Sequence, residues 1–354
     1  MYCYLSRNYK NQTSAGNKAK SDIEHIMQQM GFRNVGFRPT YYHNAVLAFL
    51  VTLAGVLKSF FCLRKGDILV LQYPLKKYFS FVCFLAHCRL AKVVVIIHDL
   101  GSFRRKKLTV KQEIARLSQA DYIVAHNKNM KEWLTEQGCI LPIGVLEIFD
   151  YLSTTTFPFT AFPEKAFRIL YAGALSYRKN SFLYKIGSYI HTLDFVLYGN
   201  GFDMDKAEGK EHLHYKGFVN SDDLIKEAEG DFGLVWDGDS IDECSGDWGS
   251  YLRFNNPHKT SLYLRCGLPV IIWSKAALAG FVKENGVGIC IDSLRDLDTV
   301  LSGLTAEEYQ QMKKNVERIS KQLSEGYYCR KALLLAEGSL RENVIKPRLS
   351  VRYL

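Results

Sequence analysis

The sequence predicts an α/β protein built from two Rossmann-like, doubly wound domains. Short apolar runs alternate with helical patterns along almost the whole chain, and residues 151–166, which show neither pattern, interrupt the alternation. The length of 354 residues also suits two domains. Because strands that alternate with helices form parallel sheets with right-handed crossovers, each half of the chain is expected to build its own sheet.

The predicted strands of the first half lie in residues 67–73, 92–99 and 121–127. The segment 92–99, KVVVIIHD, is rich in Val and Ile and shows no polar alternation. This pattern is typical of a central parallel strand that is buried on both faces. The residues after 127 predict a helix that ends at Gly138, because glycine readily takes the left-handed conformation found at helix ends.

The alternation starts again after residues 151–166, which contain two Pro and a run of Thr and which we interpret as a linker. The second half has five predicted strands, in residues 167–173, 193–199, 231–238, 268–274 and 287–293. We therefore expect three segments along the chain: an N-terminal domain in residues 1–155, a C-terminal domain in residues 156–337, and a basic tail in residues 338–354.

Cysteine usage and the apolar runs limit the class of protein. The nine Cys include no CxxC pair and lie mostly in apolar runs, which favours reduced, buried thiols in a cytosolic protein over a zinc site. The first eleven residues lack the apolar core of a signal peptide, so none is expected. Residues 45–63 are apolar but interrupted by Thr, Gly, Lys and Ser, which favours a buried or interfacial helix over a membrane-spanning one.

The excess positive charge lies in the first half of the chain. The formal net charge is +10, and the first 150 residues contain 21 Lys and Arg but only 10 Asp and Glu. A basic surface of this kind fits an anionic partner, such as acidic lipid headgroups or a phosphorylated acceptor, although an ordinary solvated basic face explains it equally well. No nucleic-acid-binding motif accompanies the charge, so nucleic acid is not expected as a partner.

Two loops after predicted strands of the second half could bind an anion. The segment GALSYRKN leaves a strand and enters a helix, with Arg178 and Lys179 near the first helical turn. Cations are disfavoured at that end of a helix unless an anion lies opposite, which favours a phosphate site over two solvated side chains. The segment YGNG holds Tyr198 and Gly199, and its glycines allow a ligand to approach the backbone, as they would in any tight turn.

The most specific segment is NNPHKTSLYLRCGLPVIIW, residues 255–273. Asn256 is expected to cap a helix whose first residue is Pro257, which would place Lys259, Thr260 and the following Ser at the open amide end. A helix N-terminus that carries these side chains is suited to binding a diphosphate. An ordinary capped helix would explain the Asn and the Pro but not the Lys and the His.

Three further loops are candidates. Ser14 and Gly16 belong to a small-residue loop that opens a helix and permits close approach of a ligand. His98 and Asp99 end the strongest strand of the first domain, where a general base would stand, although either could instead cap the following turn. The DGD sequence at residues 237–239 lies in an acidic loop that we interpret as a sugar-binding or lid loop, with a metal site as the less favoured alternative.

These motifs together resemble those of the glycosyltransferase B fold enzymes. More narrowly, the chain is similar to the bacterial galactofuranosyltransferase/glucosyltransferase family that builds surface polysaccharides and adhesin glycans. The resemblance covers roughly residues 1–335 and rests on TSAGN, IHDLGSFR, GALSYRKN, YGNG, GLVWDGDS and NNPHKTSLYLRCGLPVI.

The resemblance implies two domains that face a central cleft, with the acceptor in the N-terminal domain and a UDP-sugar in the C-terminal domain. Positions in this chain match the family's nucleotide-binding regions as follows: Ser14, Gly16, Arg178, Lys179, Tyr198, Gly199, Asn255, Asn256, Pro257, His258, Lys259 and Thr260. The UDP-sugar is expected as a substrate, with no further cofactor. A homo-oligomer is left open.

The chain departs from many retaining enzymes of this fold at two positions. Those enzymes carry two glutamates, eight positions apart, where this sequence has Phe254 and Leu262. A mechanism that needs those acids therefore does not transfer. The sequence favours an inverting displacement with a base from the N-terminal domain, either Asp99 or His98, and without an obligatory metal.

We therefore expect a hexosyltransferase that moves galactofuranose, galactose or glucose from UDP to a glycan acceptor. The acceptor would be membrane-linked or protein-linked, and the enzyme would be cytoplasmic, with its basic half suited to docking at the inner membrane face. Two alternatives remain from the sequence. One is a UDP-sugar epimerase on the same architecture, and the other is a catalytically silent partner subunit that binds UDP.

Overall fold

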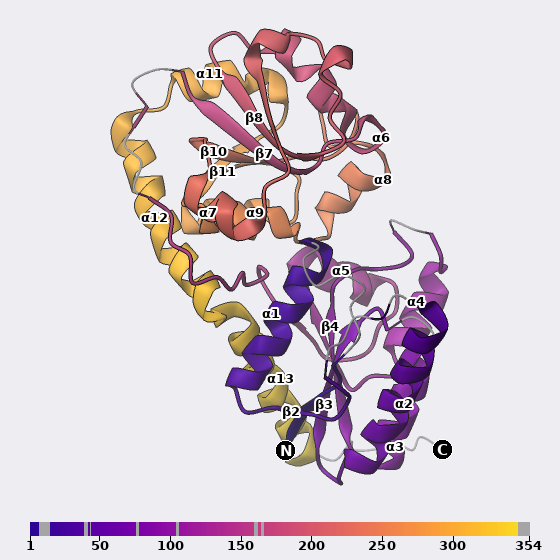
Figure 1. Cartoon of the computed structure of the whole chain (residues 1–354). Coiled ribbons are helices and arrows are strands. Elements are labelled where there is room, and N and C mark those ends of the chain that lie inside the picture. The colour runs from indigo at the N-terminus through magenta and orange to yellow at the C-terminus, as the bar shows by residue number, and fades with distance from the viewer. Residues whose placement is uncertain are drawn as a thin grey trace, which may run out of the picture. The chain divides into compact units, whose positions relative to one another are not determined.

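The computed structural model describes residues 1–6, 15–38, 42, 44–75, 78–103, 106–158, 162–163 and 166–345. Of the candidate site residues named above, Ser14 lies outside this set. The chain forms two compact units (Figure 1). One comprises Met1–Leu146 together with Tyr328–Leu354, and the other comprises Glu147–Tyr327.

The first unit holds a parallel sheet of six strands among the described residues, in the order β2-β1-β3-β4-β5-β6. The strands are β1 (Tyr2–Tyr4), β2 (Arg33–Asn34), β3 (Ile68–Tyr73), β4 (Lys92–Ile97), β5 (Tyr122–Ala125) and β6 (Ile143–Val145). The helices are α1 (Ala15–Gln29), α2 (Ala45–Cys62), α3 (Phe79–Cys88), α4 (Val110–Leu117), α5 (Lys128–Glu136) and α13 (Tyr327–Ile345).

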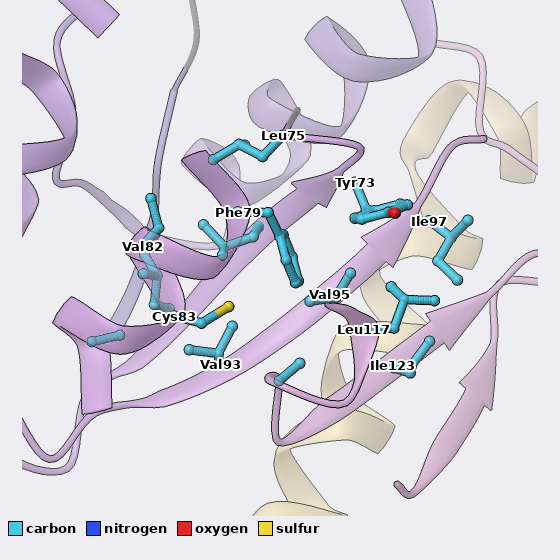
Figure 2. Packing of buried hydrophobic residues seen from close by; sticks show 14 of the residues in the cluster. Tyr73, Leu75, Phe79, Val82, Cys83, Val93, Val95, Ile97, Leu117 and Ile123 are labelled. Atoms are coloured by element: carbon cyan, nitrogen blue, oxygen red, sulfur yellow. The ribbon is translucent and has the colours of Figure 1, made fainter. Parts of the chain in front are cut away.

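The core of this unit forms where the Val and Ile residues of β4 meet α3 (Figure 2). Val93 and Val95 are fully buried, as are Phe79 and Val82 of α3. The Phe79 ring lies edge-on to Tyr73 of β3, with ring centroids 5.2 Å apart. The absence of polar alternation in β4 therefore has the predicted cause, which is burial on both faces of the sheet.

The second unit also holds a parallel sheet of six strands, all within the described residues, in the order β12-β11-β10-β7-β8-β9. The strands are β7 (Arg168–Ala174), β8 (Asp194–Asn200), β9 (Leu213–Gly217), β10 (Phe232–Val235), β11 (Val270–Trp273) and β12 (Gly288–Ile291). The α-helices are α6 (Tyr177–Asn180), α7 (Ser221–Glu227), α8 (Gly246–Gly249), α9 (His258–Arg265), α10 (Ala279–Asn285), α11 (Leu297–Ser302) and α12 (Ala306–Glu325). Short 3-10 helices occupy Ser181–Tyr184, Ile186–Tyr189, Met204–Lys206, Lys210–His212, Ser250–Arg253 and Leu294–Asp296.

The prediction of two doubly wound α/β sheets is confirmed, and each of the eight predicted strands coincides with an observed one. The observed division differs from the expected boundaries at residues 155 and 337. Residues from Glu147 onward already pack within the second unit, since Tyr151 donates its amide to Leu323 O over 3.1 Å and Ser261 donates to Phe149 O over 2.6 Å.

The C-terminal segment also differs from the expected separate tail. Helix α13 continues through Ile345, and its residues from Tyr328 onward belong to the first unit. Arg330 donates to Gln29 of α1 over 2.5 Å, and Arg341 donates to the Tyr2 hydroxyl over 3.4 Å. The end of the chain therefore returns to the N-terminal sheet. Residues 346–354 lie outside the described residues.

Two glycines allow β7 and β8 to pair closely at their carboxyl ends. Gly173 lies opposite Gly199 in the register, with φ values of +142° and +143°. A Cβ at Gly199 would lie 1.9 Å from the Gly173 carbonyl oxygen. The glycine of the YGNG segment is therefore needed for strand packing, whatever ligand approaches it.

We predict that Gly199→Ala lowers the free energy of unfolding by about 2–4 kcal/mol, because the new methyl group clashes with backbone and the φ value is strained. Urea unfolding followed by far-UV circular dichroism measures the change. The control is Gly280→Ala in α10, where a Cβ meets no atom within 4 Å. Equal stability of the two variants would contradict this account of Gly199.

Candidate functional site

The second unit gathers two lysines around one buried carboxylate at the carboxyl ends of its central strands. Asp237 follows β10 by two residues, Lys179 lies on α6 after β7, and Lys259 lies in the first turn of α9. In parallel α/β sheets this edge is where ligands bind, because the loops that follow the strands meet there.

The three side chains converge on one oxygen atom. Oδ1 of Asp237 lies 3.1 Å from Nζ of Lys259 and 3.5 Å from Nζ of Lys179. The Tyr171 hydroxyl of β7 also lies 3.0 Å from it. Lys259 donates in addition to the Tyr171 hydroxyl over 2.8 Å, and its ammonium lies 4.1 Å from the centroid of that ring. The cluster is therefore held by hydrogen bonds and by cation–π contact.

Burial affects the pKa values of both partners of this ion pair. Burial raises the pKa of Asp237, but the charges of Lys259 and Lys179, together with hydrogen bonds from Lys259 and Tyr171, outweigh it and leave the pKa below its usual value. Burial lowers the pKa of Lys259 to about 8, although Asp237 opposes the shift. Two cations share one carboxylate, so the cluster carries an excess positive charge that an anionic ligand would balance.

Helix α9 presents its amide end without a side-chain cap. Pro257 is the N-cap residue and the helix begins at His258, so the expectation of an Asn256 cap with Pro257 as the first helical residue is wrong. Asn256 is buried and donates to Glu147 O over 3.0 Å instead. The Thr260 amide of the first turn is donated to Pro257 O over 3.0 Å, and the positive end of the helix dipole, beside Lys259, favours an anion.

Most of the other predicted residues of this segment pack in the interior of the second unit, and one joins the cluster around Asp237. His258 stacks on Tyr151, with ring centroids 4.7 Å apart, and Thr260 is completely buried. Oδ1 of Asn255 is also buried and has no hydrogen-bond partner among the described residues. Of the predicted run 255–260, Lys259 is the residue that the structure joins to Asp237.

Only one of the two predicted cations of α6 joins the cluster. Lys179 contacts Asp237 and lies 5.2 Å from the centroid of the Trp248 ring, whereas Arg178 is exposed. The neighbouring Asn180 is buried and donates to Ala174 O over 2.7 Å, and its Oδ1 accepts the Gly238 amide over 3.3 Å. This amide side chain fixes the α6 turn against the loop that carries Asp237.

Tyr198 is not part of the cluster. Its hydroxyl accepts the Glu229 amide over 3.3 Å, and Glu229 precedes β10, at the opposite edge of the sheet from Asp237. Burial raises the pKa of this hydroxyl. The backbone of Gly199 does lie at the carboxyl edge, where its carbonyl oxygen accepts from the Tyr215 hydroxyl over 3.0 Å.

The acidic side chains of the loop after β10 form ion pairs or hydrogen bonds with other residues of the second unit. Asp237 is engaged by the lysines, Asp239 accepts from Ser245, and Asp242 accepts from Arg295 over 2.6 Å. Within the part of the chain that the structure describes, no group of three or more His, Cys, Asp or Glu side chains could hold a metal ion. The first Asp of the DGD sequence therefore anchors cations in this structure.

The sequence did not lead us to assign Tyr171 or Asp237 to the cluster that joins Lys179 and Lys259. Tyr171 lies in a buried strand, so its hydroxyl gives no signal distinct from an ordinary core tyrosine. Asp237 was noticed, but as part of a lid or sugar-binding loop. Its position directly after an apolar strand was the available signal for a buried carboxylate at the sheet edge.

The base candidates lie in the first unit, after β4. Nε2 of His98 lies 2.6 Å from Oε1 of Gln72, an oxygen that can only accept, so Nε2 donates this hydrogen bond. Both His98 and Asp99 are partly buried. Gly16 lies in the first turn of α1, and Ser14 lies outside the described residues.

A buried glutamate holds the loop that follows Asp99. Glu113 of α4 is fully buried and accepts the amides of Gly101 and Ser102, each over 2.8 Å, and the Tyr73 hydroxyl over 2.8 Å. This arrangement fixes the backbone beside the two base candidates.

Two family models match the sequence, and together they cover most of the chain. The model described as "Glucosyltransferase 3-like, N-terminal domain" matches residues 2–148. The model described as "Glucosyltransferase 3-like, C-terminal domain" matches residues 169–336.

Named relatives match over most of their length. "Beta-1,6-galactofuranosyltransferase WbbI" of Escherichia coli (strain K12) is 36% identical over 282 residues, which cover 78% of this chain and 81% of that protein. "Glucosyltransferase 3" of Streptococcus gordonii is 26% identical over 325 residues, which cover 89% of this chain and 92% of that protein.

Solved structures share the fold at low identity. Anabaena Alr3699/HepE in complex with UDP has a TM-score of 0.60 and 11% identity, and covers 96% of this chain and 99% of its own. The lipopolysaccharide outer core galactosyltransferase WaaB in its apo form has a TM-score of 0.59 and 12% identity, with the same coverage of 96% and 99%. The predicted glycosyltransferase B fold is confirmed by these likenesses.

Proposed function

Because this chain belongs to the glucosyltransferase 3-like family, and is thus a glycosyltransferase, we propose that it transfers a hexosyl residue from a UDP-sugar to a glycan acceptor. The hexosyl residue in this proposal is galactofuranose, galactose or glucose. The acceptor is a membrane-linked or protein-linked glycan of surface polysaccharide or glycoprotein synthesis, and transfer takes place in the cytoplasm.

One observation carries the donor assignment, which is the excess positive charge at the carboxyl edge of the second sheet. Lys179 and Lys259 offer a diphosphate charge-assisted hydrogen bonds, and the positive end of the α9 dipole, where Lys259 lies, adds to the attraction. The structures of HepE with UDP and with UDP-glucose support a UDP-sugar for a protein of this fold. The names of the relatives favour transfer over epimerisation and over a silent partner subunit.

The proposed reaction is a direct, inverting displacement. The acceptor hydroxyl attacks the anomeric carbon, the bond from that carbon to the β-phosphate oxygen breaks, and a base accepts the hydroxyl proton. The UDP leaving group takes the electron pair, and the lysines stabilise its developing charge without an obligatory metal. Phe254 and Leu262 supply no carboxylate, which is consistent with a base from the first unit.

Lysine substitutions test the diphosphate site. We expect Lys179→Ala and Lys259→Ala to weaken UDP binding by about tenfold or more, since each removes a charge-assisted hydrogen bond. Calorimetric titration with and without Mg²⁺ measures the affinities. Lys226→Ala is the matched control, because Lys226 is a 68% exposed lysine on α7, outside the cluster around Asp237. Unchanged affinity in both lysine variants would contradict the assignment.

The affinity for UDP should also depend on pH. Lys259 has a pKa of about 8, so it is charged below that pH and loses its charge above it. A bound diphosphate favours the charged form, so the Kd should be constant between about pH 7 and 8, where UDP is fully ionised, and rise by up to about tenfold per pH unit above pH 8. Titrations across this range measure the dependence. Lys259→Arg stays charged and should flatten the profile. The same rise with pH in that variant would count against Lys259.

Neutral substitutions test the base. We expect either Asp99→Asn or His98→Gln to reduce kcat/KM for transfer by about 10²–10⁴-fold, because proton transfer from the acceptor is lost. Single-turnover assays with a radiolabelled UDP-sugar measure transfer, and the UDP affinity of the second unit serves as the control because it should not change. Full activity in both variants would show that neither residue is the base.

A further inference from the structure

Helix α2 of the first unit turns an apolar stripe toward solvent. Val46, Leu50, Leu57 and Phe61 are exposed and recur at helical spacing along one face, with Phe61 79% exposed. The opposite face holds the buried Val56 and Ser59. A surface helix normally presents polar residues outward, so this pattern is the reverse of the usual one.

Helix α3 extends the apolar surface beside it. Phe81 and Phe84 of α3 are exposed, and Phe84 is 61% exposed. The two helices are in contact, since Tyr78 donates to Phe49 O over 3.2 Å and their rings lie 5.8 Å apart. Both helices lie along the same side of the first unit in Figure 1. We call the exposed apolar side chains of α2 and α3 the α2–α3 face.

The segment that carries both helices of this face is rich in basic residues and poor in acidic ones. Residues 25–98 contain nine Lys and Arg but only one carboxylate, that of Asp67. Asp67 is buried and paired with the Met1 amine over 3.1 Å and with Arg33 over 3.5 Å. Arg64 and Lys65 are exposed in the turn directly after α2.

We propose that the α2–α3 face docks on the surface of an anionic lipid bilayer. Exposed Phe and Leu side chains enter the boundary between headgroups and acyl chains, and the flanking Lys and Arg contact the anionic headgroups. In the part of the chain that the structure describes, no helix is both long and apolar enough to cross a membrane, so the contact is interfacial. A second copy of the chain fits this face less well, because two surfaces with a cationic rim repel each other.

Vesicle co-sedimentation of the full chain tests this inference. We expect wild type to bind vesicles of phosphatidylcholine with phosphatidylglycerol, and to bind less as salt increases. Phe61→Ser with Phe84→Ser should reduce partitioning by about tenfold for each Phe removed. Arg64→Glu with Lys65→Glu should reduce it by at least about fivefold for each cation. Phe218→Ser is the matched control, because Phe218 is 65% exposed in the second unit and should leave binding unchanged.

Three results would overturn the proposal. The first is equal binding of wild type and the double Phe variant to anionic vesicles. The second is equal binding of wild type to pure phosphatidylcholine vesicles. The third is a wild-type dimer in sedimentation velocity that becomes a monomer in the double Phe variant, which would assign the face to a second copy. UDP affinity is measured in every variant and should not change, so failure of the docking surface is distinguishable from failure of the donor site.

Discussion

A single carboxylate oxygen, Oδ1 of Asp237, organises the polar site of the second unit. It receives Lys179, Lys259 and the Tyr171 hydroxyl, which come from three different segments of the chain. Lysines held this close together in a mostly buried place would repel each other, and the carboxylate offsets that repulsion while leaving one positive charge unbalanced. The same interaction therefore stabilises the loops that carry these side chains and leaves a positive charge that the proposed diphosphate would balance.

Buried polar side chains hold loop backbones at the carboxyl edges of both sheets. Asn180 ties the α6 turn to Gly238 in the second unit, and Glu113 ties the loop of Gly101 and Ser102 in the first. Such loops cannot be held by apolar packing alone, because their amides need acceptors once water is excluded. The sheets supply rigid platforms, and these two side chains fix where the two loops lie on them.

The sequence predicted those features that have a local physical signature. Residues 92–99 were recognisable because a strand buried on both faces lacks polar alternation, and Lys259 because a cation is unusual in the first turn of a helix. Strand β9 was missed because its residues His214 to Lys216 are exposed and polar. The choice of Lys179 over Arg178, the hydroxyl of Tyr171 and the return of α13 to the first unit depend on tertiary contacts, which a single sequence does not encode in any local pattern.

A crystal structure of the chain with UDP bound tests the central claim most directly. The account predicts phosphate oxygens within hydrogen-bond distance of Lys259 Nζ and of the first amides of α9, with Asp237 still beside the lysines. A diphosphate bound away from Lys179 and Lys259, with their contacts to Asp237 unchanged, would contradict it. In that case the lysines would have a purely structural role in the second unit.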